Sequence, residues 1–161
     1  MGGVMRIARY AQGLAVALWL GSGVVAEAAQ YQKCRPGQPN TADKHCLVDG
    51  DTYWIEGRKY RLKGIDTPEP QTHLCGGARE KALAQRASAR ALELLNTGTW
   101  QIRTHGLDNT DTRVLVSILV DGRDLGEILV SEGLARTWPD GEEFWCAPQA
   151  PAPWWRKWLG L

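Results

Sequence analysis

Short runs of apolar and alternating residues fill the chain just after position 45. Three of them follow one another: CLV (46–48), TYWIEG (52–57) and KYRLKGI (59–65). The pair Asp49-Gly50 separates the first two runs, and a DG pair in that setting indicates a hairpin. A second turn at Glu56-Gly57 leads into the third run, whose Tyr60, Leu62 and Ile65 are expected to face a core. The pattern predicts a three-stranded meander.

The segment from Gly77 to Gly98 changes to a helical period. Its apolar positions are Leu83, Ala87, Ala91, Leu94 and Leu95. Its charged positions, expected on the outer face, are Arg79, Glu80, Lys81, Arg86 and Arg90. A glycine after the last turn is a typical helix stop, so an amphipathic helix that packs on the sheet is predicted here.

Two more strands and a second helix follow. TWQIRT (99–104) alternates, RVLVSILV (113–120) is the most β-prone run of the chain, and Asp121-Gly122 turns it back. In LGEILVSEGLA (125–135), Leu125, Ile128, Leu129 and Leu134 lie on one helical side. The resulting order predicts a mainly β (α+β) fold, a five-stranded OB-fold-like barrel capped by two to three helices.

The ends of the chain differ from this central part. Residues 1–28 combine Arg6 and Arg9 with a long uncharged run and an A-x-A site, which predicts a secretory signal peptide. An uncleaved membrane anchor is the alternative, although the apolar run is short of the roughly 20 residues that span a bilayer. The expected organisation is then an N-terminal arm (29–45), a barrel domain (46–138) and a Pro/Trp-rich tail (139–161), exported to the periplasm or the medium.

The cysteine usage agrees with export. All four cysteines follow the predicted leader, and an even count in an exported chain favours two disulfides over a metal site. Of the three possible connectivities, Cys34 with Cys46 and Cys75 with Cys146 is favoured, because the first pair closes a short loop that contains Pro and Gly.

The charge of the mature part is balanced. Removing the leader takes two arginines and one glutamate from 19 basic and 18 acidic residues, which leaves 17 of each. A protein that bound nucleic acid through its overall field would be basic. Contacts with phosphates must therefore come from a few placed arginines and a metal ion.

One stretch concentrates the residues suited to chemistry. Asp51 lies in the first hairpin, and Asp66 ends the third strand, where it can return beside that hairpin. Paired carboxylates with backbone carbonyls suit Ca²⁺ or another hard cation such as Mg²⁺ or Mn²⁺. Glu69 follows within reach of a water molecule, and Arg61 precedes Asp66 on the same strand. A cation site, a carboxylate base and arginines are the parts of a phosphodiester hydrolase.

Four pieces in order resemble the staphylococcal-nuclease (thermonuclease) family. They are VDGDT (48–52), RLKGIDTPE (61–69), an isolated Arg113 before a β-prone strand, and DLGEILVSEGLA (124–135). The resemblance covers roughly residues 46–138 and implies the OB-fold barrel. It also implies a Ca²⁺-dependent endonuclease that hydrolyses single-stranded DNA or RNA by in-line attack of water, with 3′-phosphate and 5′-hydroxyl products.

The resemblance assigns roles position by position. Asp51 and Asp66 match the calcium aspartates, and Thr67 matches the residue that offers its main-chain carbonyl to the ion. Glu69 matches the glutamate usually cast as the general base. Arg61 and Arg113 match the two arginines that bind the phosphate and stabilise its transition state.

The chain also departs from the family pattern. The second arginine usually follows a Tyr-Gly pair, whereas Asp111 and Thr112 stand before Arg113 here. The aromatic residue that would lie against a nucleotide is therefore missing from this loop. Base stacking contributes roughly 1–3 kcal/mol per base in single-strand binders, so a weaker or altered substrate preference is expected.

Several other features carry weaker signals. His73 is a candidate ligand or base, but the three histidines do not cluster in sequence. Trp138 either packs at the end of the last helix, the favoured interpretation, or replaces the missing stacking aromatic. The tail residues Trp154, Trp155, Trp158 and Leu161 fit a flap over the barrel, a membrane contact or a partner contact.

Three functional hypotheses remain open at this point. The leading one is the exported nuclease, monomeric and without a membrane span once the leader is removed. The second is a catalytically weak or inactive barrel of the same fold that binds nucleic acid or protein. The third is an envelope protein whose Trp-rich tail docks on a partner. Calcium-dependent turnover separates the first from the second.

Overall fold

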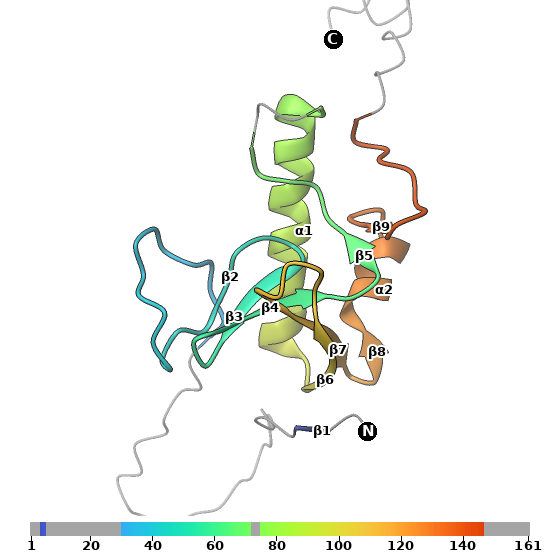
Figure 1. Ribbon diagram of the computed structural model, residues 1–161. Coiled ribbons are helices and arrows are strands. Elements are labelled where there is room, and N and C mark those ends of the chain that lie inside the picture. Colours follow the sequence, from blue (N-terminus) through green and yellow to red (C-terminus); the bar gives the residue numbers. More distant parts are fainter. Residues whose placement is uncertain (1–3, 6–29, 72–74, 147–161) are drawn as a thin grey trace, which may run out of the picture.

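The computed structural model describes residues 4–5, 30–71 and 75–146. Its strands are β1 (Val4–Met5), β2 (Cys46–Leu47), β3 (Thr52–Ile55), β4 (Arg58–Leu62), β5 (Ile65–Asp66), β6 (Trp100–Leu107), β7 (Val114–Val120), β8 (Arg123–Asp124) and β9 (Arg136–Thr137). Its helices are α1 (Gly77–Thr97) and α2 (Leu125–Ser131). Figure 1 shows α1 behind the central strands and α2 beside β7 and β8. The α+β fold with two helices is as predicted.

The main sheet begins with the predicted meander. Strands β2, β3 and β4 pair antiparallel through the two expected turns. Glu56 and Gly57 both have positive φ, as the tight turn between β3 and β4 requires. Strand β4 then pairs in parallel with β7, which pairs antiparallel with β6. Within the described residues the main sheet runs in the open order β1-β6-β7-β4-β3-β2, with β8 alongside β7, so a closed barrel stays a prediction.

A second, two-stranded sheet was not predicted from the sequence. Strand β5 pairs antiparallel with β9, which sets Asp66 opposite Arg136. Each strand has only two residues, and about 70 residues of chain separate them. This short pairing brings the end of the chain beside the stretch that carries the predicted chemistry.

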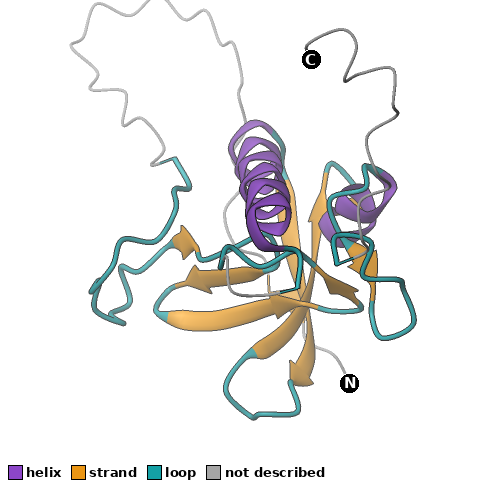
Figure 2. Ribbon diagram, turned by 90° about the horizontal axis from the view of Figure 1, so that it is seen from above, coloured by secondary structure: helices purple, strands orange, loops and turns teal. Residues whose placement is uncertain are grey.

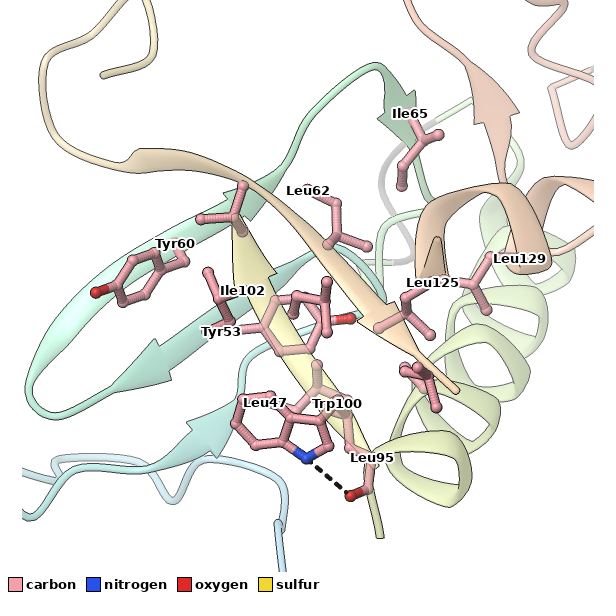
Figure 3. Close-up of a cluster of buried hydrophobic side chains, with 14 of the residues drawn as sticks. Leu47, Tyr53, Tyr60, Leu62, Ile65, Leu95, Trp100, Ile102, Leu125 and Leu129 are labelled. Atoms are coloured by element: carbon pink, nitrogen blue, oxygen red, sulfur yellow. Dashed lines mark hydrogen bonds between the residues drawn. The ribbon is translucent and has the colours of Figure 1, made fainter. Parts of the chain in front are cut away.

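The core lies between the strands and α1 (Figures 2 and 3). The predicted core positions Tyr60, Leu62 and Ile65 are buried. In α1, Ala87, Ala91 and Leu95 are buried, and Leu83 and Leu94 pack on them in part. All four apolar positions expected for the second helix are buried as well: Leu125, Ile128, Leu129 and Leu134. The helical and strand periods therefore identified the correct faces.

The polar face of α1 differs from expectation at two positions. Arg90 donates to Glu132 through Nε and Nη2, and so links α1 to the end of α2. Glu80, expected on the outer face, is only 2% exposed. It belongs to the buried stripe because it lies four residues before Ala84, which faces the core.

Both predicted disulfides are present. Cys34 is bonded to Cys46, which ties the N-terminal arm to β2. Cys75 is bonded to Cys146 across a separation of 71 residues. The second bond fixes the start of α1 to the segment that follows β9.

Several expectations concern residues outside the described ranges. They include His73, the tail residues 147–161 and all of the predicted leader except Val4–Met5, which pair with β6. Among the described residues, neither helix has the length and apolar character that a bilayer crossing requires.

Candidate active site

The first hairpin buries Asp51. Asp49 shapes the turn by accepting the backbone N–H groups of Asp51 and Thr52 at 3.2 and 2.8 Å. The Asp51 carboxylate is 2% exposed and accepts from the Thr52 hydroxyl at 2.8 Å and from the Thr67 backbone N–H at 3.1 Å. The last bond joins the hairpin to the turn after β5, so the two acidic stretches meet as predicted.

Arg61 bridges the two predicted metal aspartates. Its Nη1 donates to Asp51 Oδ1 at 2.9 Å, and its Nη2 donates to Asp66 Oδ1 at 2.8 Å. The Arg61 side chain keeps 20% exposure. One guanidinium therefore fixes both carboxylates while an edge of it stays open to a ligand.

Arg136 is a site residue that the sequence reasoning missed. It donates through Nε and Nη2 to Asp66 Oδ2 at 3.1 and 3.0 Å, and it also reaches Glu143 Oε1 at 2.6 Å. Asp66 is thus held between two arginines, one from β4 and one from β9. The sequence around Arg136, GLAR (133–136), did not indicate a role for this arginine, because its partner Asp66 lies 70 residues away.

A pocket of about 600 Å³, here called the central pocket, lies beside these groups. Its polar and charged lining comprises Arg61, Lys63, Asp66, Glu69, Asp108, Asn109, Thr110 and Arg113, and Trp138 adds an aromatic wall. Four of the six predicted site residues line it: Arg61, Asp66, Glu69 and Arg113. Asp51 and Thr67 are buried and are joined to it through their bonds to each other and to Arg61.

The acidic groups raise one another's affinity for protons. Burial, together with the charge of Asp49, raises the pKa of Asp51 to about 7, although Arg61, Thr52 and Thr67 act in the opposite direction. Burial raises the pKa of Glu69, and the charges of Asp49, Asp66 and Glu80 add to this. A carboxylate with a raised pKa is better suited to take a proton from water.

The donor set fits a hard divalent cation. Asp51 and Asp66 both bind the Arg61 guanidinium, Asp66 also binds that of Arg136, and the charges of Asp49 and Asp66 act on Glu69. The surplus negative charge is what a bound cation would offset, and carboxylate oxygens are the ligands that Ca²⁺ and Mg²⁺ prefer. Among the described residues, the group whose ligand atoms all lie within 4.8 Å of one another is a different one, Cys75, Glu80 and Cys146, and its two sulfurs form a disulfide. The oxygens of Asp51 and Asp66 are instead bonded to arginines and to backbone or hydroxyl donors.

Arg113 is held by its own loop. Its Nε donates to Asp108 Oδ2 at 2.6 Å, and Asp108 Oδ1 accepts the backbone N–H groups of Thr110, Thr112 and Arg113. Burial of Asp108 opposes its ionisation, but these hydrogen bonds hold its pKa below the usual value. Asp108 is therefore a charged anchor that aims the second arginine into the central pocket, and sequence reasoning did not single it out.

The loop that departs from the family pattern has a distinct backbone. Asp111, where an aromatic residue was expected, has a φ of 54° and is exposed. Asp111 N donates to Asp108 O at 3.0 Å, and Asp108 N donates to Arg113 O at 2.9 Å. The loop therefore closes on itself, and the changed residues leave Arg113 at the central pocket.

Trp138 corrects an expectation. Burial at the end of the last helix was favoured, but the side chain is 56% exposed and lines the central pocket. Strand β9 carries the chain past α2, and Trp138 N donates to Gly64 O at 2.9 Å, which fixes the residue beside β5. The Arg136 guanidinium lies 4.9 Å from its ring centroid. An aromatic surface is thus present at the pocket from a different segment.

Glu80 positions the Glu69 turn. Its Oε1 accepts the backbone N–H of Glu69 at 3.2 Å, and its Oε2 accepts that of Gly76 at 3.0 Å. Both oxygens of this buried carboxylate are used, so the start of α1 is fastened directly to the candidate base. Glu80 itself does not line the central pocket, so it acts through Glu69.

Glu80→Gln is expected to lower kcat by between about 10- and 100-fold, because an amide keeps only one acceptor oxygen and the Glu69 turn shifts. Removing the Glu80 charge also lowers the pKa of Glu69. The acidic limb of the kcat/KM profile should therefore move to lower pH. Rate measurements across pH check both effects. Glu93→Gln, on the exposed face of α1, is the control. An unchanged rate with an unmoved limb would contradict the positioning role.

Comparison with known proteins identifies the family of this chain. The model of the family described as "Staphylococcal nuclease homologue" matches residues 59–144, more than half of the chain. The chain belongs to the staphylococcal nuclease homologue family. The match includes all the predicted site residues except Asp51, which precedes it and is joined to it by hydrogen bonds.

The chain is also similar to a curated protein that is named as an endonuclease. "Endonuclease YncB" of Bacillus subtilis (strain 168) is 35% identical to this member of the nuclease family over 96 residues. The matched region is 55% of this chain and 44% of that protein. The chain therefore spans less than half the length of the relative.

Proposed function

We propose that this staphylococcal nuclease homologue hydrolyses phosphodiester bonds of single-stranded DNA or RNA with the help of Ca²⁺. The observation that carries the proposal is the central pocket, where two arginines from different elements face an acidic cluster with Glu69 at its edge. A phosphate bound between Arg61 and Arg113 would lie beside a carboxylate that can accept a proton from water. Family membership and the name of the relative support the same activity.

In this mechanism the site residues have different roles. Arg61 and Arg113 bind the two free oxygens of the phosphate and stabilise the charge that grows on them during attack. Glu69 orients a water molecule and takes its proton, which suits in-line displacement of the 5′ oxygen and a 3′-phosphate product. Asp51, Asp66 and the Thr67 carbonyl would hold the ion. When bound, the ion supplies a positive charge that offsets the charge developing on the phosphate.

The exposed ring of Trp138 gives the substrate a second point of contact. It lies at the same pocket as the two arginines, where a base adjoining the bound phosphate can stack on it. It would take the place of the aromatic that is absent from the loop before Arg113. We also infer that the protein is an exported monomer, which the leader-like N-terminus and the two disulfides support.

The test is cleavage of denatured DNA and of RNA by the oxidised protein. We expect cleavage with Ca²⁺ and none with a chelator. Glu69→Gln should lower kcat by about 10²–10⁴-fold, the usual contribution of a general base. End-labelling of the products identifies the 3′-phosphate. A folded protein that binds Ca²⁺ and single-stranded DNA but cleaves neither substrate would favour the alternative, a binding module with an inactive site.

A further inference from the structure

We propose that single-stranded nucleic acid extends from the central pocket along the outer face of β7 to a second pocket that grips its backbone with Arg103 and Arg123. This second pocket, here called the distal pocket, has a volume of about 410 Å³. Its lining includes Arg103, Ser117, Leu119 and Arg123. The inference rests on the proposed function, because it names the path of the same substrate.

The register of the sheet places the two pockets on one face. Side chains at alternate positions of a strand point to the same side, so Leu115, Ser117 and Leu119 share a face of β7. Val116, Ile118 and Val120 point into the core. Leu115 lines the central pocket, whereas Ser117 and Leu119 line the distal pocket. The two pockets are thus joined along about 13 Å of one strand.

Cations continue along this face. Arg61 pairs with Leu115 in register, and Lys63, two residues further on, also lines the central pocket. Arg103 pairs with Ser117, and on β8 Asp124 pairs with Leu119 and Arg123 with Val120. The Arg123 side chain is exposed at the far end of β7, where it lines the distal pocket. A strand that leaves Arg61 therefore meets Lys63, then Arg103 and Arg123.

His105 shows that the middle of this path is crowded with positive charge. Its Nε2 lies 3.1 Å from the Oγ of Ser117, a residue of the distal pocket. Burial lowers the pKa of His105, and the charges of Lys63 and Arg103 lower it further, while Asp124 acts in the opposite direction. Two cations near one imidazole make a favourable surface for a polyanion.

Two acidic residues also line the distal pocket, and their surroundings differ from those of the arginines. Asp124 caps α2, since its Oδ1 accepts the N–H groups of Gly126 and Glu127 at 2.8 and 3.2 Å. Its negative charge is therefore bonded to backbone donors. Glu127 is exposed on the helix side of the pocket. The groups of the distal pocket that can bind phosphates are therefore Arg103 and Arg123.

A salt titration of binding tests the path. In the Glu69→Gln background with Ca²⁺, the probe is a fluorescein-labelled oligothymidylate of about 16 nucleotides, the upper end of sites on barrels of this class. Each phosphate neutralised in a single strand contributes about 0.7 to the slope of log K against log salt. Arg103→Gln with Arg123→Gln should therefore reduce the slope by about 1.4 and weaken binding several-fold at low salt. Lys81→Gln with Arg86→Gln, on exposed positions of α1, removes the same charge and should leave the slope unchanged.

Cleavage of a dinucleotide separates this inference from the proposed function. Such a substrate reaches only the central pocket, so the distal double variant should cleave it at the wild-type rate. If the wild type shows no cleavage, and the slope nevertheless falls in the distal variant and not in the α1 control, the path stands and the nuclease proposal fails. A distal variant with the slope of the α1 control, or a parent Glu69→Gln protein that does not bind the probe, would overturn the path.

Discussion

Arg113→Lys is expected to lower kcat on denatured DNA by about 10²–10³-fold, the range found when one preorganised donor to a developing oxyanion is removed. A lysine keeps the charge but loses the planar fork that can donate to a phosphate and to Asp108 together. In the structure Nε is occupied by Asp108, which leaves the Nη groups to face the central pocket. Steady-state kinetics with Ca²⁺ provide the measurement.

The stability of this variant should change little, since Asp108 keeps its backbone donors from the loop. Arg86→Lys, on the exposed side of α1, is the matched control and should leave kcat unchanged. If Arg113→Lys retained wild-type kcat with an intact fold, Arg113 would not be a transition-state donor. Arg61 is less suitable for this test, because it also neutralises buried Asp51.

In the metal-free protein, stability should fall as the pH rises from about 4 to about 7. Asp51 has a pKa raised to about 7 in the folded state, so the native state binds a proton over this range that the unfolded chain has released. The ionised form therefore costs folding free energy, up to about 4 kcal/mol once the pH exceeds 7. Chemical denaturation with a chelator present, repeated across this range, measures the loss.

Asp51→Asn isolates this contribution, because the asparagine does not titrate. The variant itself is less stable at acidic pH because its hydrogen bonds are altered. Its free energy of unfolding should nevertheless decline less between pH 4 and 7 than that of the wild type, by the amount that ionisation of Asp51 costs. Ca²⁺ should restore the wild type above pH 7, since an ion that binds only the folded state stabilises it. An equal decline in both proteins would show that Asp51 is ionised throughout.

The local pattern of the chain predicted the elements that depend on neighbouring residues. The DG turn, the meander and both helices follow from alternation and from the 3.6-residue period. The same pattern could have placed Glu80 inside, because it lies on the stripe that continues through Ala84, Ala87 and Ala91. It was assigned to the outer face because charged residues are rarely buried without partners.

Groups that depend on distant pairing could not be predicted in this way. Arg136 reaches Asp66 only because two strands of two residues pair across some 70 positions, and neither strand has a recognisable pattern. Asp108 depends on the conformation of an irregular loop. Trp138 was judged from its position after a helix, whereas β9 carries it out to the pocket. The pattern of the meander already placed Asp51, Asp66, Glu69 and Arg61 together, and the resemblance to a family added Thr67 and Arg113 to this set.

The tie between Cys75 and Cys146 has a consequence for the order of biosynthesis. A ribosome delivers the hairpins and both helices before residues 136–146. Until then Asp66 lacks Arg136, and the loop after Glu69 has no covalent partner. Chains fold from the N-terminus during synthesis, so a nascent chain holds the acidic cluster with Arg61 but without Arg136. The site would thus be complete only when translation of this segment has finished and the bond between Cys75 and Cys146 has formed.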